Sequence, residues 1–348
     1  MLDPVAWLDV PQEVSTGTLP GWERVDEIVR EAHARYAGER GGRVADYIPV
    51  LAEADPELFG LAVIEVGGGV HDAGDALHPF SIQSISKMFV YALAIQEHGH
   101  ERVRDIVGVN NTGLAFNSVV ALELNEGHPR NPMVNAGAIA TTALMPGATA
   151  VEQWERVREG LSAFAGRPLS LDGEVYASEA ASNDRNRALG WLLKSYGRLA
   201  GDPDEIVDVY TRQCALSVTA HDLAVMGATL ADGGVNPITG ERVVTADVCR
   251  DTLAVVAASG LYENSGDWLF EIGLPAKSGV AGGIVAVSPG KGAAAGFSPR
   301  LDDAGNSVRS QMAIGHLSRS LGLNLFASAP AQADDARSGP RSAEKERS

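Results

Sequence analysis

The sequence predicts an α+β fold in which both ends of the chain contribute strands to one sheet and a helical lobe is inserted between them. Near the N-terminal end, the run 61–66 (LAVIEV) is rich in β-branched residues and leads into three glycines, 67–69. Strand character returns at 279–287 (GVAGGIVAV) and at 293–297. Helix-like spacing of apolar residues fills the middle of the chain, in the segments 84–98, 151–165, 179–199, 203–215 and 220–233.

Two further helices are predicted outside these middle segments. Segment 22–39 reaches Gly38 near its end and places five side chains on one helical face: Val25, Ile28, Val29, Ala32 and Tyr36. The last helix is predicted over 307–321, with four side chains turned inward: Val308, Met312, Ile314 and Leu317. The uncharged segment 131–151 is rich in small residues and is interrupted by Pro146, so it predicts a packed internal helix and a turn rather than a membrane span.

These elements predict one domain over residues 1–326. Its sheet lobe is expected at about 1–80 and 250–326, and its helical lobe at about 81–249. The tail 327–348 is polar and lacks apolar periodicity, which predicts disorder.

Composition excludes several classes of partner. The formal charge of −17 argues against nucleic acid and against an anionic membrane surface, because both are polyanions. The two cysteines, Cys214 and Cys249, give no disulfide framework, as is usual in a reducing compartment. The N-terminus has neither the basic nor the apolar region of a secretory signal. We therefore expect a cytoplasmic protein.

One short motif suggests chemistry: Ser84 and Lys87 in the stretch FSIQSISKMF, at the start of a predicted helix that Gly99 ends. Residues three apart share a helical face, so the hydroxyl and the amine can approach each other. The free N–H groups at a helix start suit a nucleophile whose attack creates an oxyanion. To act as a base, Lys87 must be neutral, which requires burial or a neighbouring cation.

The spacing alone is weak, because a serine N-cap followed by a solvated lysine has the same pattern. The tail contains a second copy, Ser342 and Lys345, flanked by glutamates and followed by no apolar residues. The apolar run MFVYALA follows Lys87 instead. A Lys-Ser-Gly triplet at 277–279 adds a second element, since serine enzymes with Ser-x-x-Lys place such a triplet on a strand facing the nucleophile. Ser182-Asn183-Asp184 does not match the Ser-Asp-Asn element of β-lactamases.

Longer blocks carry a resemblance to the serine-dependent glutaminases over about residues 20–326. The blocks are GRVADYIPVLA, the Ser84 segment, NPMVNAGAIA, SEAASNDRNRALGWLLKSYG, YTRQCALSVTAHDLAVMGATLADGGVNPITGERV, KSGVAGGIVAVSPGKG and FSPRLDDAGNS. The resemblance implies a β-lactamase-like fold, with an antiparallel sheet flanked by helices and an inserted helical lobe. It also implies hydrolysis of L-glutamine to L-glutamate and ammonia, with no cofactor and no metal.

By the same resemblance, Ser84 is the nucleophile and Lys87 its general base. Tyr262, or alternatively Tyr47, is implied as the proton relay to the leaving ammonia. The implied substrate contacts are Ser84, Asn135, Glu179, Asn186, Tyr210, Tyr262 and Val280. A carboxylate such as Glu179 suits the substrate ammonium. The N–H groups of Ser84 and Val280 are the expected oxyanion donors.

Two alternatives remain at this stage: another serine-lysine amidase or β-lactamase-like hydrolase, and a silent scaffold that binds glutamine. The resemblance also implies a homo-oligomer, a dimer or a tetramer. The scattered histidines predict no metal site.

Overall fold

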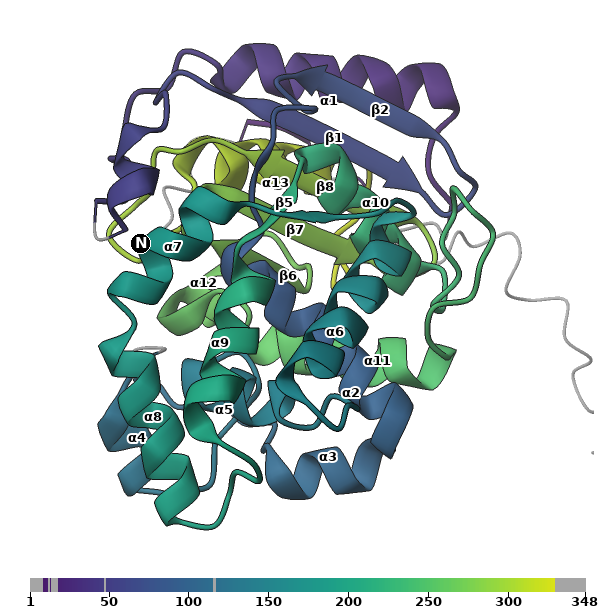
Figure 1. Cartoon of the computed structure of the whole chain (residues 1–348). Coiled ribbons are helices and arrows are strands. Elements are labelled where there is room, and N and C mark those ends of the chain that lie inside the picture. The colour runs from purple at the N-terminus through teal and green to yellow at the C-terminus, as the bar shows by residue number, and fades with distance from the viewer. Residues whose placement is uncertain (1–8, 12, 14–17, 47, 115–116, 329–348) are drawn as a thin grey trace, which may run out of the picture.

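The computed structural model describes residues 9–11, 13, 18–46, 48–114 and 117–328 (Figure 1). The predicted disordered tail therefore lies outside the described residues from position 329 on. In chain order the elements are α1 (Trp22–Tyr36), η2 (Pro49–Glu53), β1 (Gly60–Glu65), β2 (Val70–Gly74), β3 (Phe80–Ser81), η3 (Gln83–Ile85), α2 (Ser86–His98), α3 (His100–Ile106), α4 (Val119–Glu123), α5 (Asn135–Thr142), α6 (Ala150–Ala165), β4 (Ser170–Leu171), α7 (Gly173–Ala181), α8 (Asp184–Ser195), α9 (Pro203–Cys214), β5 (Leu216–Val218), α10 (Ala220–Ala231), α11 (Ala246–Ser259), η4 (Tyr262–Asn264), α12 (Ser265–Glu271), β6 (Ala276–Gly279), β7 (Gly283–Ser288), β8 (Gly292–Phe297) and α13 (Val308–Ser320).

The main sheet joins the two ends of the chain, as predicted. Its five strands lie in the order β2-β1-β8-β7-β6, and every neighbouring pair is antiparallel. The central pairing sets Ala62 of β1 opposite Ala295 of β8, although these residues are far apart in sequence. A small second sheet, β3-β5-β4, leads into the helical part of the molecule.

Both faces of the main sheet are covered, which explains why β7 and β8 are buried along their whole length. Side chains of β1 alternate between two apolar clusters: Leu61 and Val63 face α1 and α13, while Ala62 and Ile64 face α10. In Figure 1, α1 runs along the outer side of the sheet, and α2 to α6, α8 and α9 gather on the other side. A third cluster packs α5, α8 and α9 together.

Small residues in β8 (GAAAGF) let two helices approach the sheet closely. A Cβ added at Gly227 of α10 would lie 2.7 Å from Ala293 Cβ and 2.8 Å from Val285 Cγ2. On the opposite face, a Cβ at Gly296 would lie 2.7 Å from Ser310 of α13. The strand is thus held between two helices with no space for larger side chains.

Two element boundaries differ from the sequence predictions. The predicted strand 279–287 is a hairpin, in which β6 ends at Gly279 and β7 begins at Gly283. The turn depends on Gly282, whose φ of 107° is unfavourable for other residues. The predicted helix 179–199 is divided into α7 and α8 at Ser182 and Asn183.

Other predictions are confirmed. The five residues predicted on one face of the first helix are all buried in α1. All of α5 is buried, as predicted for the uncharged segment. In α13, Ile314 and Leu317 are buried, whereas Val308 and Met312 are only partly buried. Both cysteines are free thiols.

The boundaries of the two lobes stay a prediction. Helix α10 falls within the predicted helical lobe, 81–249, but packs on the sheet.

The close contact at Gly227 gives a stability prediction. Replacing Gly227 with valine should lower the free energy of unfolding by about 1–3 kcal/mol, because α10 must move away from Ala293 and Val285. Chemical denaturation measures this change. Gly266→Ala in α12 is the control, since a Cβ there meets nothing within 4 Å, and it should leave stability unchanged or slightly raised. Equal stability of the two variants would contradict the packing argument.

Candidate active site

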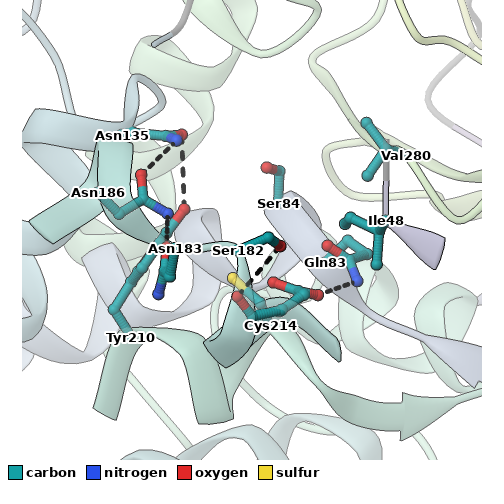
Figure 2. Close-up of a pocket in the computed structure, with 11 residues that line it drawn as sticks. Ile48, Gln83, Ser84, Asn135, Ser182, Asn183, Asn186, Tyr210, Cys214 and Val280 are labelled. Atoms are coloured by element: carbon teal, nitrogen blue, oxygen red, sulfur yellow. Dashed lines mark hydrogen bonds between the residues drawn. The ribbon is translucent and has the colours of Figure 1, made fainter. Parts of the chain in front are cut away.

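A cavity of about 160 Å³ lies between the turn after β6 and the helical part of the molecule (Figure 2). Eleven residues line it: Ile48, Gln83, Ser84, Asn135, Glu179, Ser182, Asn183, Asn186, Tyr210, Cys214 and Val280. Figure 2 shows the Ser84 side chain in the middle, with the asparagines and Tyr210 on one side and Val280 and Ile48 on the other. Most of the lining side chains carry a polar group, which suits a small polar ligand.

Ser84 lies in η3, the turn of 3-10 helix that leads into α2, and not in the first turn of α2 itself. It is partly exposed, while its neighbours Gln83 and Ile85 are buried. Gln83 has a φ of 52°, which is a strained conformation for a residue other than glycine. Such strain is concentrated at functional sites.

Lys87 follows Ser84 by three residues and is buried, with 1% of its surface exposed. Its Nζ donates to Asn135 Oδ1 at 2.7 Å and to the Met133 carbonyl at 3.2 Å. Burial lowers the pKa of Lys87 to about 8, because the charged amine is removed from water. A pKa near 8 leaves part of the lysine neutral, and able to accept a proton, at neutral pH.

Lys277 of β6 is the second buried amine near the cavity. Burial lowers its pKa well below the usual value, and the charge of Lys87 lowers it further. Its Nζ donates to the Ser278 carbonyl at 2.8 Å and lies 4.1 Å from the centre of the Tyr262 ring. Because β6 also packs on η3, the Lys-Ser-Gly triplet lies at the sheet edge next to the turn that carries Ser84.

Tyr262 links these groups. Its side chain hydrogen-bonds with Ser84, and its hydroxyl donates to the Ser278 carbonyl at 3.4 Å. Burial raises the pKa of Tyr262 to about 12. Its φ of 57° makes it the second strained residue beside Ser84.

A chain of amides runs away from Lys87 across the helical lobe. Asn135 Nδ2 donates to Asn186 Oδ1 at 2.9 Å, and Asn186 Nδ2 donates to Asn183 Oδ1 at 2.7 Å. Asn183 Nδ2 then donates to Thr211 Oγ1 of α9 at 2.6 Å, and this hydrogen bond holds the break between α7 and α8 against α9. The Tyr210 hydroxyl donates to Asn135 Oδ1 at 3.5 Å. These neutral groups can bind a carboxylate or an amide without a cation.

Glu179 is the carboxylate of the cavity. Burial raises its pKa to about 7, and the hydrogen bond from Gln83 Nε2 to Glu179 Oε1, 2.5 Å long, partly offsets that rise. A ligand ammonium would compensate the buried negative charge.

The structure brings most of the predicted site residues together. Six of them line the cavity: Ser84, Asn135, Glu179, Asn186, Tyr210 and Val280. Lys87 and Tyr262 lie beside it through the contacts above. Tyr47 lies outside the described residues.

The sequence analysis missed Gln83 and Asn183 as lining residues. Both lie inside blocks quoted for the resemblance, but their side-chain partners come from distant elements, Glu179 of α7 and Thr211 of α9. The part of the chain that the structure describes has no cluster of three His, Cys, Asp or Glu side chains suited to a metal ion. It also has no helix that is both long and apolar enough to cross a bilayer.

Comparison with known proteins agrees with this geometry. The family model described as Glutaminase matches residues 42–326. Glutaminase 2 of Yersinia pestis is 54% identical over 91% of this chain and 93% of its own length. The glutaminase of Brucella canis is 54% identical over 87% of this chain and 96% of its own.

Solved structures that are similar to this chain are also glutaminases. One described as the probable glutaminase ybaS superimposes with a TM-score of 0.87 at 45% identity, over 88% of this chain and 99% of its own. The glutamate form of Mglu has a TM-score of 0.83 at 44% identity, over 88% of this chain and 70% of its own. The chain therefore belongs to the serine-dependent glutaminase family and has its β-lactamase-like fold.

Proposed function

We propose that this glutaminase cleaves the side-chain amide of L-glutamine through an ester on Ser84, with Lys87 as the general base. The observation that carries the proposal is the environment of Lys87. Its amine is buried, donates to the neutral oxygens of Asn135 and Met133, and has a pKa that burial lowers to about 8. A lysine amine with a pKa near 8 is partly neutral at neutral pH, so Lys87 can take the proton of Ser84.

The reaction then has two halves. Ser84 Oγ attacks the side-chain carbonyl carbon as its proton passes to Lys87, and the oxyanion is stabilised by the N–H groups of Ser84 and Val280. The C–N bond breaks as a proton reaches the leaving nitrogen through Tyr262, and ammonia departs. Water attacks the ester in the second half, transfers a proton to the same base, and releases glutamate and free Ser84.

Substrate recognition follows from the charges in the cavity. Glu179 binds the α-ammonium, while Asn135, Asn186 and Tyr210 hold the polar oxygen atoms of the substrate. A ligand that lacks the α-groups would leave these buried polar atoms unpaired, and such losses reduce affinity strongly. A relative solved in its glutamate form supports this ligand class.

The alternatives raised by the sequence are weaker. Ser182-Asn183-Asp184 has the residues of the Ser-Asp-Asn element in a different order, which disfavours a β-lactamase. The lowered pKa of the buried Lys87 amine disfavours a silent scaffold. Homo-oligomerisation is supported by the resemblance alone, and a cytoplasmic location by the acidic composition and the two free cysteines.

Replacing Ser84 with alanine tests the nucleophile. We expect kcat for glutamine to fall by at least about 10³-fold, because the ester cannot form. The glutamine-like electrophile 6-diazo-5-oxo-L-norleucine should label wild-type protein at Ser84, as mass spectrometry of the peptides would show, and should not label the variant there.

Ser342→Ala is the matched control, since Ser342 and Lys345 repeat the spacing of the motif in the tail. This variant should keep full activity and full labelling. Near-normal turnover by Ser84→Ala would remove Ser84 as the nucleophile.

The pH dependence of kcat/KM tests Glu179 and Lys87. Glu179 must be ionised, so activity falls as pH decreases through about 7, and Lys87 must be neutral, so activity rises as pH increases through about 8. The logarithm of kcat/KM should therefore rise with a slope near two below pH 7, with a slope near one between 7 and 8, and level off above 8. Steady-state rates in constant-ionic-strength buffers measure this profile.

Glu179→Gln separates the two ionisations. Without the carboxylate, KM should rise on the order of 100-fold, because a buried charge pair is lost. The slope below pH 7 should fall to about one. Glu174→Gln, at an exposed position of the same helix α7, should change neither quantity. A slope of two that persists in Glu179→Gln would exclude Glu179 as the acid-side group.

A further inference from the structure

Strained backbone marks two places beside the nucleophile. Among the described residues, three residues other than glycine have a positive φ: Gln83 at 52°, Glu126 at 52° and Tyr262 at 57°. Gln83 directly precedes Ser84, and Tyr262 hydrogen-bonds with Ser84. Glu126 is exposed and does not line the cavity. Two of the three strained residues therefore contact the nucleophile or precede it.

Gln83 and Tyr262 lie in the same kind of local structure. Each begins a turn of 3-10 helix, η3 or η4, and a longer helix starts three residues later with a serine, Ser86 or Ser265. Ser86 Oγ donates to the Gln83 carbonyl at 2.8 Å, and Ser265 Oγ donates to the Tyr262 carbonyl at 2.7 Å. Three residues after Glu126 stands Pro129, which has no hydroxyl.

Both serines are buried, with 0% and 2% of the surface of Ser86 and Ser265 exposed. Each hydroxyl is also fixed by a donor. Gln213 Nε2 donates to Ser86 Oγ at 3.2 Å, and the Leu261 N–H donates to Ser265 Oγ at 3.0 Å. A buried hydroxyl with one donor and one acceptor in place has little freedom to rotate.

Gln213, which donates to Ser86, is itself held by a residue of another helix. Thr142 Oγ1 of α5 donates to Gln213 Oε1 at 3.0 Å, and both side chains are fully buried. The orientation of Ser86 is thus set by α9 and α5, the helices that also carry Tyr210 and Asn135.

Planarity of the peptide bond gives these contacts a consequence for catalysis. The carbonyl of Gln83 and the N–H of Ser84 belong to one trans peptide unit, so they point in opposite directions. Fixing the carbonyl on Ser86 therefore fixes the direction of the Ser84 N–H. In the same way, fixing the Tyr262 carbonyl on Ser265 holds the backbone from which the Tyr262 ring reaches Ser84.

We propose that Ser86 and Ser265 are positioning residues, which hold Gln83 and Tyr262 in left-handed backbone so that the Ser84 N–H and the Tyr262 hydroxyl are aimed at the reacting group. The proposal rests on the function proposed above. An N–H that stabilises the oxyanion acts only in the transition state, so its misdirection lowers kcat and leaves substrate binding largely intact.

The test compares Ser86→Ala and Ser265→Ala in the full chain, with active sites counted by exhaustive labelling of Ser84 with 6-diazo-5-oxo-L-norleucine. We expect kcat per labelled site to fall about 10- to 100-fold, with KM for glutamine within about threefold of wild type. Ser86→Cys and Ser265→Cys keep the side-chain size and weaken the donor. They should give intermediate kcat values, and they supply folded protein if an alanine variant does not fold.

Ser318→Ala is the matched control. Ser318 is equally buried, its Oγ donates to the Ile272 carbonyl at 2.6 Å, and it lies on α13 away from the cavity. It should lose thermal stability and keep kcat per labelled site. If the Ser86 and Ser265 variants behave like Ser318→Ala, the positioning role is overturned while the proposed function stands. If wild-type protein is not labelled at Ser84, both are overturned.

Discussion

The removal of one lysine amine from water is the constraint on which the rest of the site depends. A buried ammonium is costly, so the protein must either neutralise it with a carboxylate or lower its pKa. Here Lys87 donates to the neutral oxygens of Asn135 and Met133, and burial lowers its pKa to about 8. A carboxylate in their place would keep the amine protonated. The buried helix α5, which supplies Asn135, therefore contributes to the cavity as well as to the core.

The architecture brings groups from both parts of the molecule to that amine. Ser84 comes from η3 and Lys87 from the start of α2, whereas Lys277 and Val280 come from the edge strand β6 and the turn that follows it. The sheet can serve as a fixed support because β8 is held between α10 and α13 with no space for a larger side chain. Close packing of this kind resists small displacements, and an oxyanion site tolerates only small ones.

Sequence reasoning predicted the parts of this arrangement that depend on pattern. The periodicity of α1 identified its buried face, and strand character at both ends of the chain predicted one shared sheet. The assignment of the site required the family resemblance, because single residues such as Glu179 and Tyr210 have ordinary structural alternatives. What the sequence missed depends on tertiary contacts. The hairpin at Gly282 needs a φ that apolar periodicity does not encode, and the break at Asn183 follows a hydrogen bond to Thr211.

The buried amines of Lys87 and Lys277 influence each other electrostatically. The charge of Lys87 lowers the pKa of Lys277 still further, so a proton on one amine disfavours a proton on the other. Burial acts in the same direction on both pKa values, because neither charged amine has water around it to stabilise it. Lys277 Nζ can donate to the Ser278 carbonyl whether or not it is protonated, so this contact needs no second charge in the site. Burial thus keeps Lys87 weakly basic, and a weak base at this position suits the proton exchange with Ser84 that we propose at neutral pH.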